Sequence, residues 1–243
     1  MRRLILPIGC AVIAAAALSA TSAVASTTTT IRCTGTRTGV VWNRDVVVPP
    51  GKPCTLNNSV VNGGVSVQAG SYFQATNTSI SMAVVGYQSQ TVFIDTGSRV
   101  GGRISTDLTS QVFVYNATIN GSIGIKRSSS AVQVCGTTVK GSAFTVSYSQ
   151  RDILIGDPLA TGCPGNTVPN GSVTLLGNST SAEFVARGNS VSTGNLVVEN
   201  NTGPSAKYVQ SNTGGNMLKC AGNASPFVGG PNGSWATKTG QCN

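Results

Sequence analysis

The feature that most constrains the fold of this chain is a pair of short motifs that recur together at a nearly constant interval. The first motif is an aliphatic residue, any residue and then usually glycine, and its aliphatic positions are Val61, Ile80, Val100, Ile119 and Val139. These position numbers differ by 19, 20, 19 and 20 in turn. A second inward-facing position is expected four residues later, at Val65, Val84, Ile104, Ile123 and Ala143. The second motif centres on Phe73, Phe93, Phe113 and Gln133, whose numbers differ by 20 each time.

Two independent columns with one period indicate a solenoid. Each repeat is too small to bury an apolar face alone, but coils stacked about 4.8 Å apart satisfy each other's backbone groups and share one core. We therefore predict an all-β protein, a single right-handed parallel β-helix with coils of about 20 residues over residues 40–243. Prolines and glycines between residues 156 and 170 predict a loop that leaves the stack, and the segment after Cys220 predicts a C-terminal cap.

Residues 1–25 have the features of a secretory signal peptide. Arg2 and Arg3 precede an apolar run that ends at Leu18, and Ala23-Val24-Ala25 supplies the small residues of a cleavage site. Residues 26–39 are expected to form a flexible leader. No later segment approaches the roughly 18 uninterrupted apolar residues of a membrane helix. The sequence therefore predicts a secreted or cell-surface protein whose mature chain has no transmembrane segment.

The cysteines predict a disulfide-stapled fold. Six follow the signal peptide, at Cys33, Cys54, Cys135, Cys163, Cys220 and Cys242. An even set in an exported chain favours disulfides over metal or redox chemistry. Many pairings are possible, and we expect each cysteine to pair with its neighbour in the sequence, because each such bond spans about one coil.

Four features together resemble the exported right-handed parallel β-helix repeat proteins of Gram-positive bacteria: the valine run Val46–Val48, the segment Gly51–Cys54, the Val-x-Gly rungs and the closing pair Cys220 and Cys242. The resemblance covers nearly the whole mature chain. It implies the fold and no activity, because most members of this group have no assigned function. The rhythm is also similar to that of bactofilins, but those intracellular polymers have neither signal peptides nor disulfides.

The charge balance favours an anionic partner. The chain carries 16 basic and 7 acidic residues, so removing Arg2 and Arg3 leaves 14 − 7, a mature net charge of +7. A positive protein attracts acidic polysaccharides and other anionic components of a cell envelope. The basic residues are scattered, so we expect no specific nucleic-acid site.

The composition argues against catalysis. The chain contains no histidine, which excludes Ser-His-Asp and Cys-His nucleophiles. Its seven acids are dispersed, whereas a calcium-dependent lyase needs several carboxylates around the ion. We therefore expect no enzyme activity, no catalytic residue, no cofactor and no metal site. The alternative is a polysaccharide lyase or glycoside hydrolase, which would require Glu183 or Glu199 to lie beside Asp152.

Two sets of residues are candidates for ligand binding. Phe73, Phe93 and Phe113 alternate with β-branched residues, so we expect the core to take the β-branched set and the phenylalanines to form an exposed ladder. The alternative is that a loop covers them as a second small core. Tyr87, Asp107 and Arg127 are separated by the same interval as the phenylalanines and are expected to stack as a polar column. The alternative for this column is an exposed ion pair along a turn.

The sequence thus favours a non-catalytic secreted or cell-surface scaffold or interaction protein that binds an acidic glycan or an envelope partner. Besides the enzyme, a further alternative is a self-assembling structural protein of the envelope, since an open terminal coil can pair with another molecule.

Overall fold

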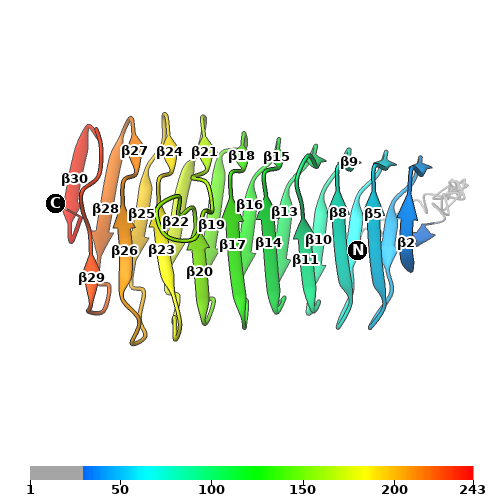
Figure 1. Cartoon of the computed structure of the whole chain (residues 1–243), viewed down its shortest axis with the longest axis horizontal. Coiled ribbons are helices and arrows are strands. Elements are labelled where there is room, and N and C mark those ends of the chain that lie inside the picture. The colour runs from blue at the N-terminus through cyan, green and yellow to red at the C-terminus, as the bar shows by residue number, and fades with distance from the viewer. Residues whose placement is uncertain (1–29, 243) are drawn as a thin grey trace, which may run out of the picture.

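The computed structural model describes residues 30–242. The predicted signal peptide and the first residues of the predicted leader lie outside the described residues. Within residues 30–242 the secondary structure consists of 30 strands and no helix, so no helix there is long and apolar enough to cross a membrane. The strands form three parallel sheets in successive coils, and the prediction of an all-β parallel β-helix is confirmed (Figure 1).

The three sheets run the length of the stack, and we name them A, B and C. Sheet A contains β1 (Ile31–Arg32), β4 (Val46–Val48), β7 (Val65–Val67), β10 (Val84–Tyr87), β13 (Ile104–Asp107), β16 (Ile123–Lys126), β19 (Ala143–Ser147), β22 (Ser172–Leu176), β25 (Leu196–Glu199), β28 (Met217–Ala221) and β30 (Thr237–Gly240). Sheet B contains β2 (Gly35–Thr38), β5 (Pro53–Asn57), β8 (Tyr72–Thr76), β11 (Thr91–Ile94), β14 (Gln111–Tyr115), β17 (Ala131–Cys135), β20 (Asp152–Ile155), β23 (Phe184–Arg187), β26 (Lys207–Gln210) and β29 (Phe227–Val228). Sheet C contains β3 (Val41–Trp42), β6 (Val60–Val61), β9 (Ser79–Ile80), β12 (Arg99–Val100), β15 (Thr118–Ile119), β18 (Thr138–Val139), β21 (Thr167–Val168), β24 (Ser190–Val191) and β27 (Thr213–Gly214).

Each sheet contributes inward columns of aliphatic side chains to one continuous core. The aliphatic-x-Gly motif forms the inward column of sheet C, where Val61, Ile80, Val100, Ile119 and Val139 are all fully buried. The position four residues later forms an inward column of sheet A, as predicted at Val65, Val84, Ile104 and Ile123. The prediction is wrong at Ala143, because Ile123 pairs with Phe144. The turn before β19 is one residue longer than expected, so Phe144 points into the core and Ala143 is partly exposed.

The first coil begins earlier than expected. The segment assigned to a flexible leader includes β1 and β2, which pair with β4 and β5. The predicted loop excursion is also shorter than 156–170, because β21 already begins at Thr167 and rejoins sheet C.

Stacked polar side chains line two corners of the coil. Between sheets B and C the inner positions are Ser59, Thr78 and Ser98, then Ala117, which has no polar side chain, and then Thr137, followed by Asn166, Asn189, Asn212 and Asn232. Between sheets A and B, Ser128 and Ser149 are followed by Asn178, Asn201 and Asn223. Within each run, which Ala117 interrupts once, the side-chain oxygen of one coil accepts a hydrogen bond from the backbone N–H of the coil before it. These ladders satisfy buried backbone groups at the turns.

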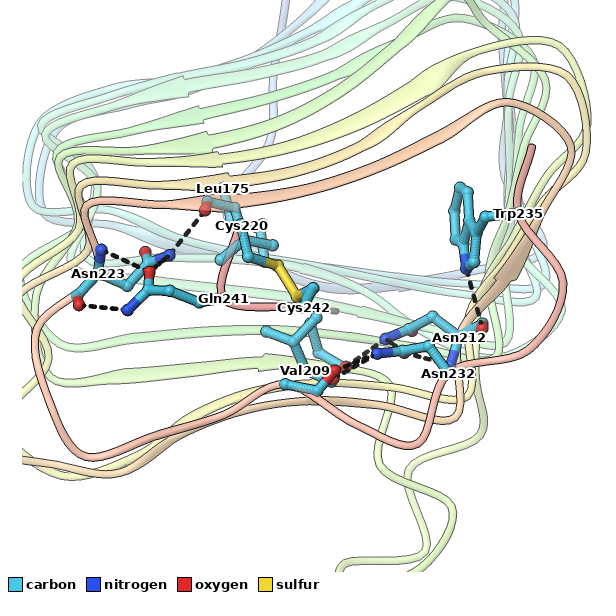
Figure 2. Close-up of a disulfide and its surroundings, with 12 residues drawn as sticks. Leu175, Val209, Asn212, Cys220, Asn223, Asn232, Trp235, Gln241 and Cys242 are labelled. Carbon is cyan, nitrogen blue, oxygen red and sulfur yellow. Dashed lines mark hydrogen bonds between the residues drawn. A yellow bond between two sulfur atoms is a disulfide. The ribbon is translucent and has the colours of Figure 1, made fainter. Parts of the chain in front are cut away.

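The disulfides pair as predicted. Cys33 bonds to Cys54, Cys135 to Cys163 and Cys220 to Cys242. The first and last bonds lie in the core near the two ends of the stack. Figure 2 shows the last one, where the asparagine ladders also end: Asn223 donates to Gln241, and Trp235 covers the final turn by donating to the carbonyl of Asn212.

Candidate functional site

The outer face of sheet B carries a cluster of aromatic rings. Phe93 and Phe113 point outward from adjacent strands, paired residue to residue, with ring centroids 5.7 Å apart. Tyr115 joins them, 5.3 Å from Phe93 and 6.0 Å from Phe113. We call these three residues the aromatic platform. Tyr115 was not singled out from the sequence, although its spacing of two residues from Phe113 on one strand puts both side chains on one face.

Phe73 does not belong to the platform, and the prediction of a three-phenylalanine ladder is wrong at this residue. Phe73 pairs with Val92 and is fully buried in the core. The residue that precedes Phe93 in the outward column is Gln74. The coil from Phe73 to Val92 is one residue shorter than the assumed period, and a slip of one residue moves a side chain to the opposite face of a strand.

Amide and hydroxyl groups surround the platform. The Tyr72 hydroxyl donates to Gln74 Oε1 at 2.7 Å, and Thr91 Oγ1 donates to Gln111 Oε1 at 3.1 Å. The Tyr115 hydroxyl donates to Gln133 Oε1. Partial burial, with the nearby Asp95 carboxylate as the second cause, raises the pKa of Tyr115, so this hydroxyl keeps its proton at neutral pH. The face therefore combines ring surfaces with fixed polar groups.

A loop covers the same face beyond the platform. After β20 the chain from residue 157 to 165 leaves the stack, and in Figure 1 it lies in front of sheet B near β20 and β23. It buries Leu154 and Val185 together with the disulfide of Cys135 and Cys163 as a second small core, with Tyr115 at its edge. The alternative expectation was that a loop covers the phenylalanines as a second small core. The loop covers Leu154 and Val185, the next residues of the same column, whereas Phe93 and Phe113 remain partly exposed.

Three kinds of contact fasten this loop. The first is the disulfide between Cys135 and Cys163. The second is a buried ion pair in which Arg187 Nη1 lies 3.1 Å from Asp157 Oδ1. Arg187 is held in turn by stacking 4.4 Å from the Tyr208 ring centroid. The third is a backbone hydrogen bond of 2.7 Å from Gly136 N to Pro164 O.

A cavity of about 400 Å³ lies between the loop and sheet B. Gln133 and Leu154 lie on its sheet side, and the loop contributes residues 161–164. Tyr115 and Glu183 also line it, so the cavity adjoins the aromatic platform. Its volume falls in the lower part of the range of roughly 300–1,000 Å³ that is usual for small-molecule sites.

Glu183 lies next to Asp152 in adjacent coils. Ile153 pairs with Phe184, and Ile153 N donates to the carbonyl of Glu183 at 2.9 Å, which puts the two acids at equivalent positions. Partial burial, followed by the charges of Asp157 and Asp152, raises the pKa of Glu183. Glu199 is elsewhere, on sheet A, where its carboxylate lies 2.6 Å from Lys219 Nζ. Of the two acids weighed from the sequence, Glu183 meets the geometric requirement and Glu199 does not.

The polar column on sheet A is an exposed ion pair. Tyr87 pairs with Asp107 as expected, but the residue opposite Asp107 in the next coil is Lys126, with Arg127 one position later. Arg127 still reaches back, and its Nε donates to Asp107 Oδ1 at 2.8 Å. This hydrogen bond lowers the pKa of Asp107. Asp107 and Arg127 do not line the cavity beside the aromatic platform, so they are not part of the candidate site.

No group of three or more histidine, cysteine, aspartate or glutamate side chains within residues 30–242 is arranged to hold a metal ion. No family model, no curated protein and no solved structure matches the chain. The function therefore has to be inferred from the outer face of sheet B and its cavity.

Proposed function

We propose that this protein acts outside the cell as a non-catalytic glycan-binding protein, and that the outer face of sheet B is its binding surface. The observation that carries the proposal is the aromatic platform of Phe93, Phe113 and Tyr115 beside fixed amide groups and a cavity. Aromatic rings pack against the apolar faces of sugars, while amides and hydroxyls bind the hydroxyl groups at the sugar edge. The three disulfides support an extracellular location.

The charges near this surface favour a neutral glycan over the acidic one suggested by the net charge. Asp95 is close enough to Tyr115 to raise its pKa, and Glu183 lines the cavity. Arg187, a cation at the edge of the same face, is paired with Asp157. An acidic polymer would meet the carboxylates of Asp95 and Glu183 here, and like charges in contact are unfavourable.

The test is binding of the folded protein, from Ser26 onward, to a panel of neutral and acidic polysaccharides at low and high salt. We expect neutral glycans to bind with little dependence on salt, because screening acts on charge–charge attraction. Phe93→Ala and Phe113→Ala together should weaken binding about 100-fold, since one stacked ring is worth about 1.4 kcal/mol, or a factor of ten. Both rings point away from the core, so the double variant should keep its fold, as unfolding curves can verify.

Tyr87→Ala is the matched control, because Tyr87 is an aromatic residue with 54% exposure on sheet A. Its binding should equal that of the unchanged protein. The proposal fails if the double variant binds like Tyr87→Ala, or if no polysaccharide binds. Binding to acidic polymers alone, lost in high salt, would replace the neutral glycan by the acidic one expected from the net charge.

The second candidate function is glycoside hydrolysis, and the position of Glu183 beside Asp152 favours it. Such enzymes use two carboxyl groups, one of them an acid with a raised pKa. Neighbouring coils lie about 4.8 Å apart, which is close to the spacing of roughly 5 Å found in retaining enzymes. Release of reducing ends from a bound glycan, abolished by both Glu183→Gln and Asp152→Asn, would establish this function. Unchanged glycan after prolonged incubation would exclude it.

A further inference from the structure

The outward column of sheet B that contains the platform runs parallel to the long axis of the solenoid. Its members on successive coils are Gln74, Phe93, Phe113 and Gln133, followed by Leu154 and Val185. Coils lie about 4.8 Å apart, so the two rings and the two amides form a straight track from Gln74 to Gln133. A glycan chain lying on both rings would therefore align with the solenoid axis.

The track is open at one end and closed at the other. Beyond Gln133 the column continues with Leu154 and Val185, which are only 5% and 1% exposed because the loop lies over them. The disulfide to Cys135 and the buried ion pair to Arg187 fasten this loop on both sides of β20. A chain on the platform cannot continue past β20 along this column without displacing a cross-linked segment.

The cavity is at the point where the track closes. It is lined by Gln133 and Leu154 of the column, by Thr161 and its neighbours from the loop, and by Glu183 at the side. Its volume of about 400 Å³ suits one or two sugar units better than a continuing polymer. The cavity thus forms a blind end to the track.

Two polar groups at this blind end are available to a ligand. Gln133 Oε1 accepts the Tyr115 hydroxyl, and no residue within 30–242 accepts a hydrogen bond from its Nε2. The Glu183 carboxyl likewise makes no hydrogen bond or ion pair with the described part of the chain, although it lines the cavity. An amide donor and a carboxyl group thus line the same cavity as the apolar side chains of Leu154 and Pro164. A sugar ring has the complementary arrangement, hydroxyls around an apolar face.

We infer that this protein recognises the end of a neutral glycan chain, with the terminal sugar in the cavity beneath the loop and the preceding sugars on Phe113 and Phe93. The inference rests on the proposed glycan-binding function and adds that chain ends, not internal segments, are the ligand.

The test uses one neutral polysaccharide that the protein binds, cut to a series of average chain lengths and compared at equal mass. End recognition predicts one protein bound per chain at every length, so the capacity per unit mass rises as the chains become shorter. Titration calorimetry measures this stoichiometry without any variant. Capacity that stays constant per unit mass would show binding along the chain and overturn the inference, while leaving the proposed function intact. Absence of binding at every length would instead refute the proposed function.

A pair of loop variants tests the cavity directly. Thr161→Trp places a large side chain at an exposed position that lines the cavity. It should lower the affinity for a short oligosaccharide at least tenfold, the effect of losing about 1.4 kcal/mol of contacts with the terminal sugar. Leu159→Trp is the control, since Leu159 belongs to the same loop, is 72% exposed and does not line the cavity. Equal affinities for the two variants would overturn the placement of the chain end in the cavity.

Discussion

The asparagine ladder between sheets A and B offers a stringent test of what holds the C-terminal half of the stack together. Asn201 is fully buried and takes part in four hydrogen bonds through its side chain. Its Oδ1 accepts from Asn178 N at 3.1 Å and Asn178 Nδ2 at 2.9 Å. Its Nδ2 donates to Leu175 O at 3.0 Å and to Asn223 Oδ1 at 2.8 Å.

Replacing Asn201 with alanine should lower the free energy of unfolding by about 3 kcal/mol, the combined effect of the hydrogen bonds that are lost. The backbone N–H of Asn178 loses its acceptor and stays buried, which costs about 2 kcal/mol, and the other lost hydrogen bonds add about 1 kcal/mol. Asn62→Ala is the control, because Asn62 is exposed and bonds to Asn43 outside the core. That change should cost less than about 0.5 kcal/mol. Urea unfolding monitored by circular dichroism gives both values.

Hydrogen exchange locates the same effect. The backbone amide of Asn178 should exchange much faster in Asn201→Ala. The exchange rate of the Val65 amide, near the N-terminal end of the stack, should not change. Asn201→Asp keeps an acceptor for Asn178 but turns carboxylate oxygens toward Leu175 O and Asn223 Oδ1, so it should be at least as unstable as Asn201→Ala at neutral pH. The role of the ladder in stabilising the stack would be refuted if Asn201→Ala and Asn62→Ala lowered the free energy of unfolding equally and the amide of Asn178 stayed equally protected from exchange.

Three further predictions concern charged side chains. Because burial raises the pKa of Glu183 in the folded protein, the folded state holds its proton longer, and unfolding free energy should fall as the pH rises from the unfolded pKa of about 4.3 through the folded one. Glu183→Gln should remove this decrease in denaturation curves taken between pH 4 and about pH 7. Lys207 is buried, with Nζ donating to the carbonyls of Gly203 and Ser205, and burial lowers its pKa. Its contribution to stability should therefore rise as the pH increases from the folded pKa toward the unfolded value of about 10.4, and Lys207→Met, compared with the unchanged protein over this range, should lack that rise. Asp107→Asn breaks an exposed ion pair and should change the unfolding free energy by less than about 1 kcal/mol; a larger loss in thermal denaturation would contradict the interpretation of this pair as a surface contact.

The fold could be predicted from the sequence because the aliphatic columns repeat with nearly constant spacing, and the disulfides because each neighbouring pair spans about one coil. The register within a coil was harder. Phe73 pairs with Val92, one position short of the regular interval, whereas Phe93 pairs with Phe113 at the full interval. The aliphatic-x-Gly motif has the same short interval from Val61 to Ile80, so the sequence did contain the signal that places Phe73 in the core.

The candidate site could be predicted only in part. Phe93 and Phe113 follow from alternation, and Tyr115 could have been found by the same rule. The cavity depends on where the loop docks, and that is decided by contacts between distant residues. Asp157 meets Arg187, 30 positions later, and Cys163 meets Cys135 on the outer face. The sequence predicted this disulfide, but not that the loop would lie beside the platform and bring Glu183 to the edge of a cavity.

The loop can be inserted without interrupting the stack because the corner ladder continues across it. Thr137, in the last coil before the loop, donates its backbone N–H to Asn166 Oδ1 at 3.0 Å, over a separation of 29 residues. Asn166 Nδ2 then binds Val134 O at 2.7 Å and Asn189 Oδ1 at 3.0 Å. A serine or threonine hydroxyl has one proton and cannot donate to both a carbonyl and the next side chain, whereas an asparagine amide can.

The change from hydroxyl to amide side chains therefore occurs at Asn166, the first ladder residue between sheets B and C after the loop. The ladder intervals are 19 and 20 residues from Ser59 to Ser98, and 23 residues from Asn166 to Asn189. Each asparagine ties three coils together and holds the turn while the chain between turns grows longer. Residues 157–165 lie outside this ladder, because Asn166 carries the ladder from the coil of Thr137 to the coil of Asn189. Because this segment is not part of the ladder, it can extend over sheet B, close the track and shape a cavity, and the candidate site therefore lies at the loop and not on the regular faces of the solenoid.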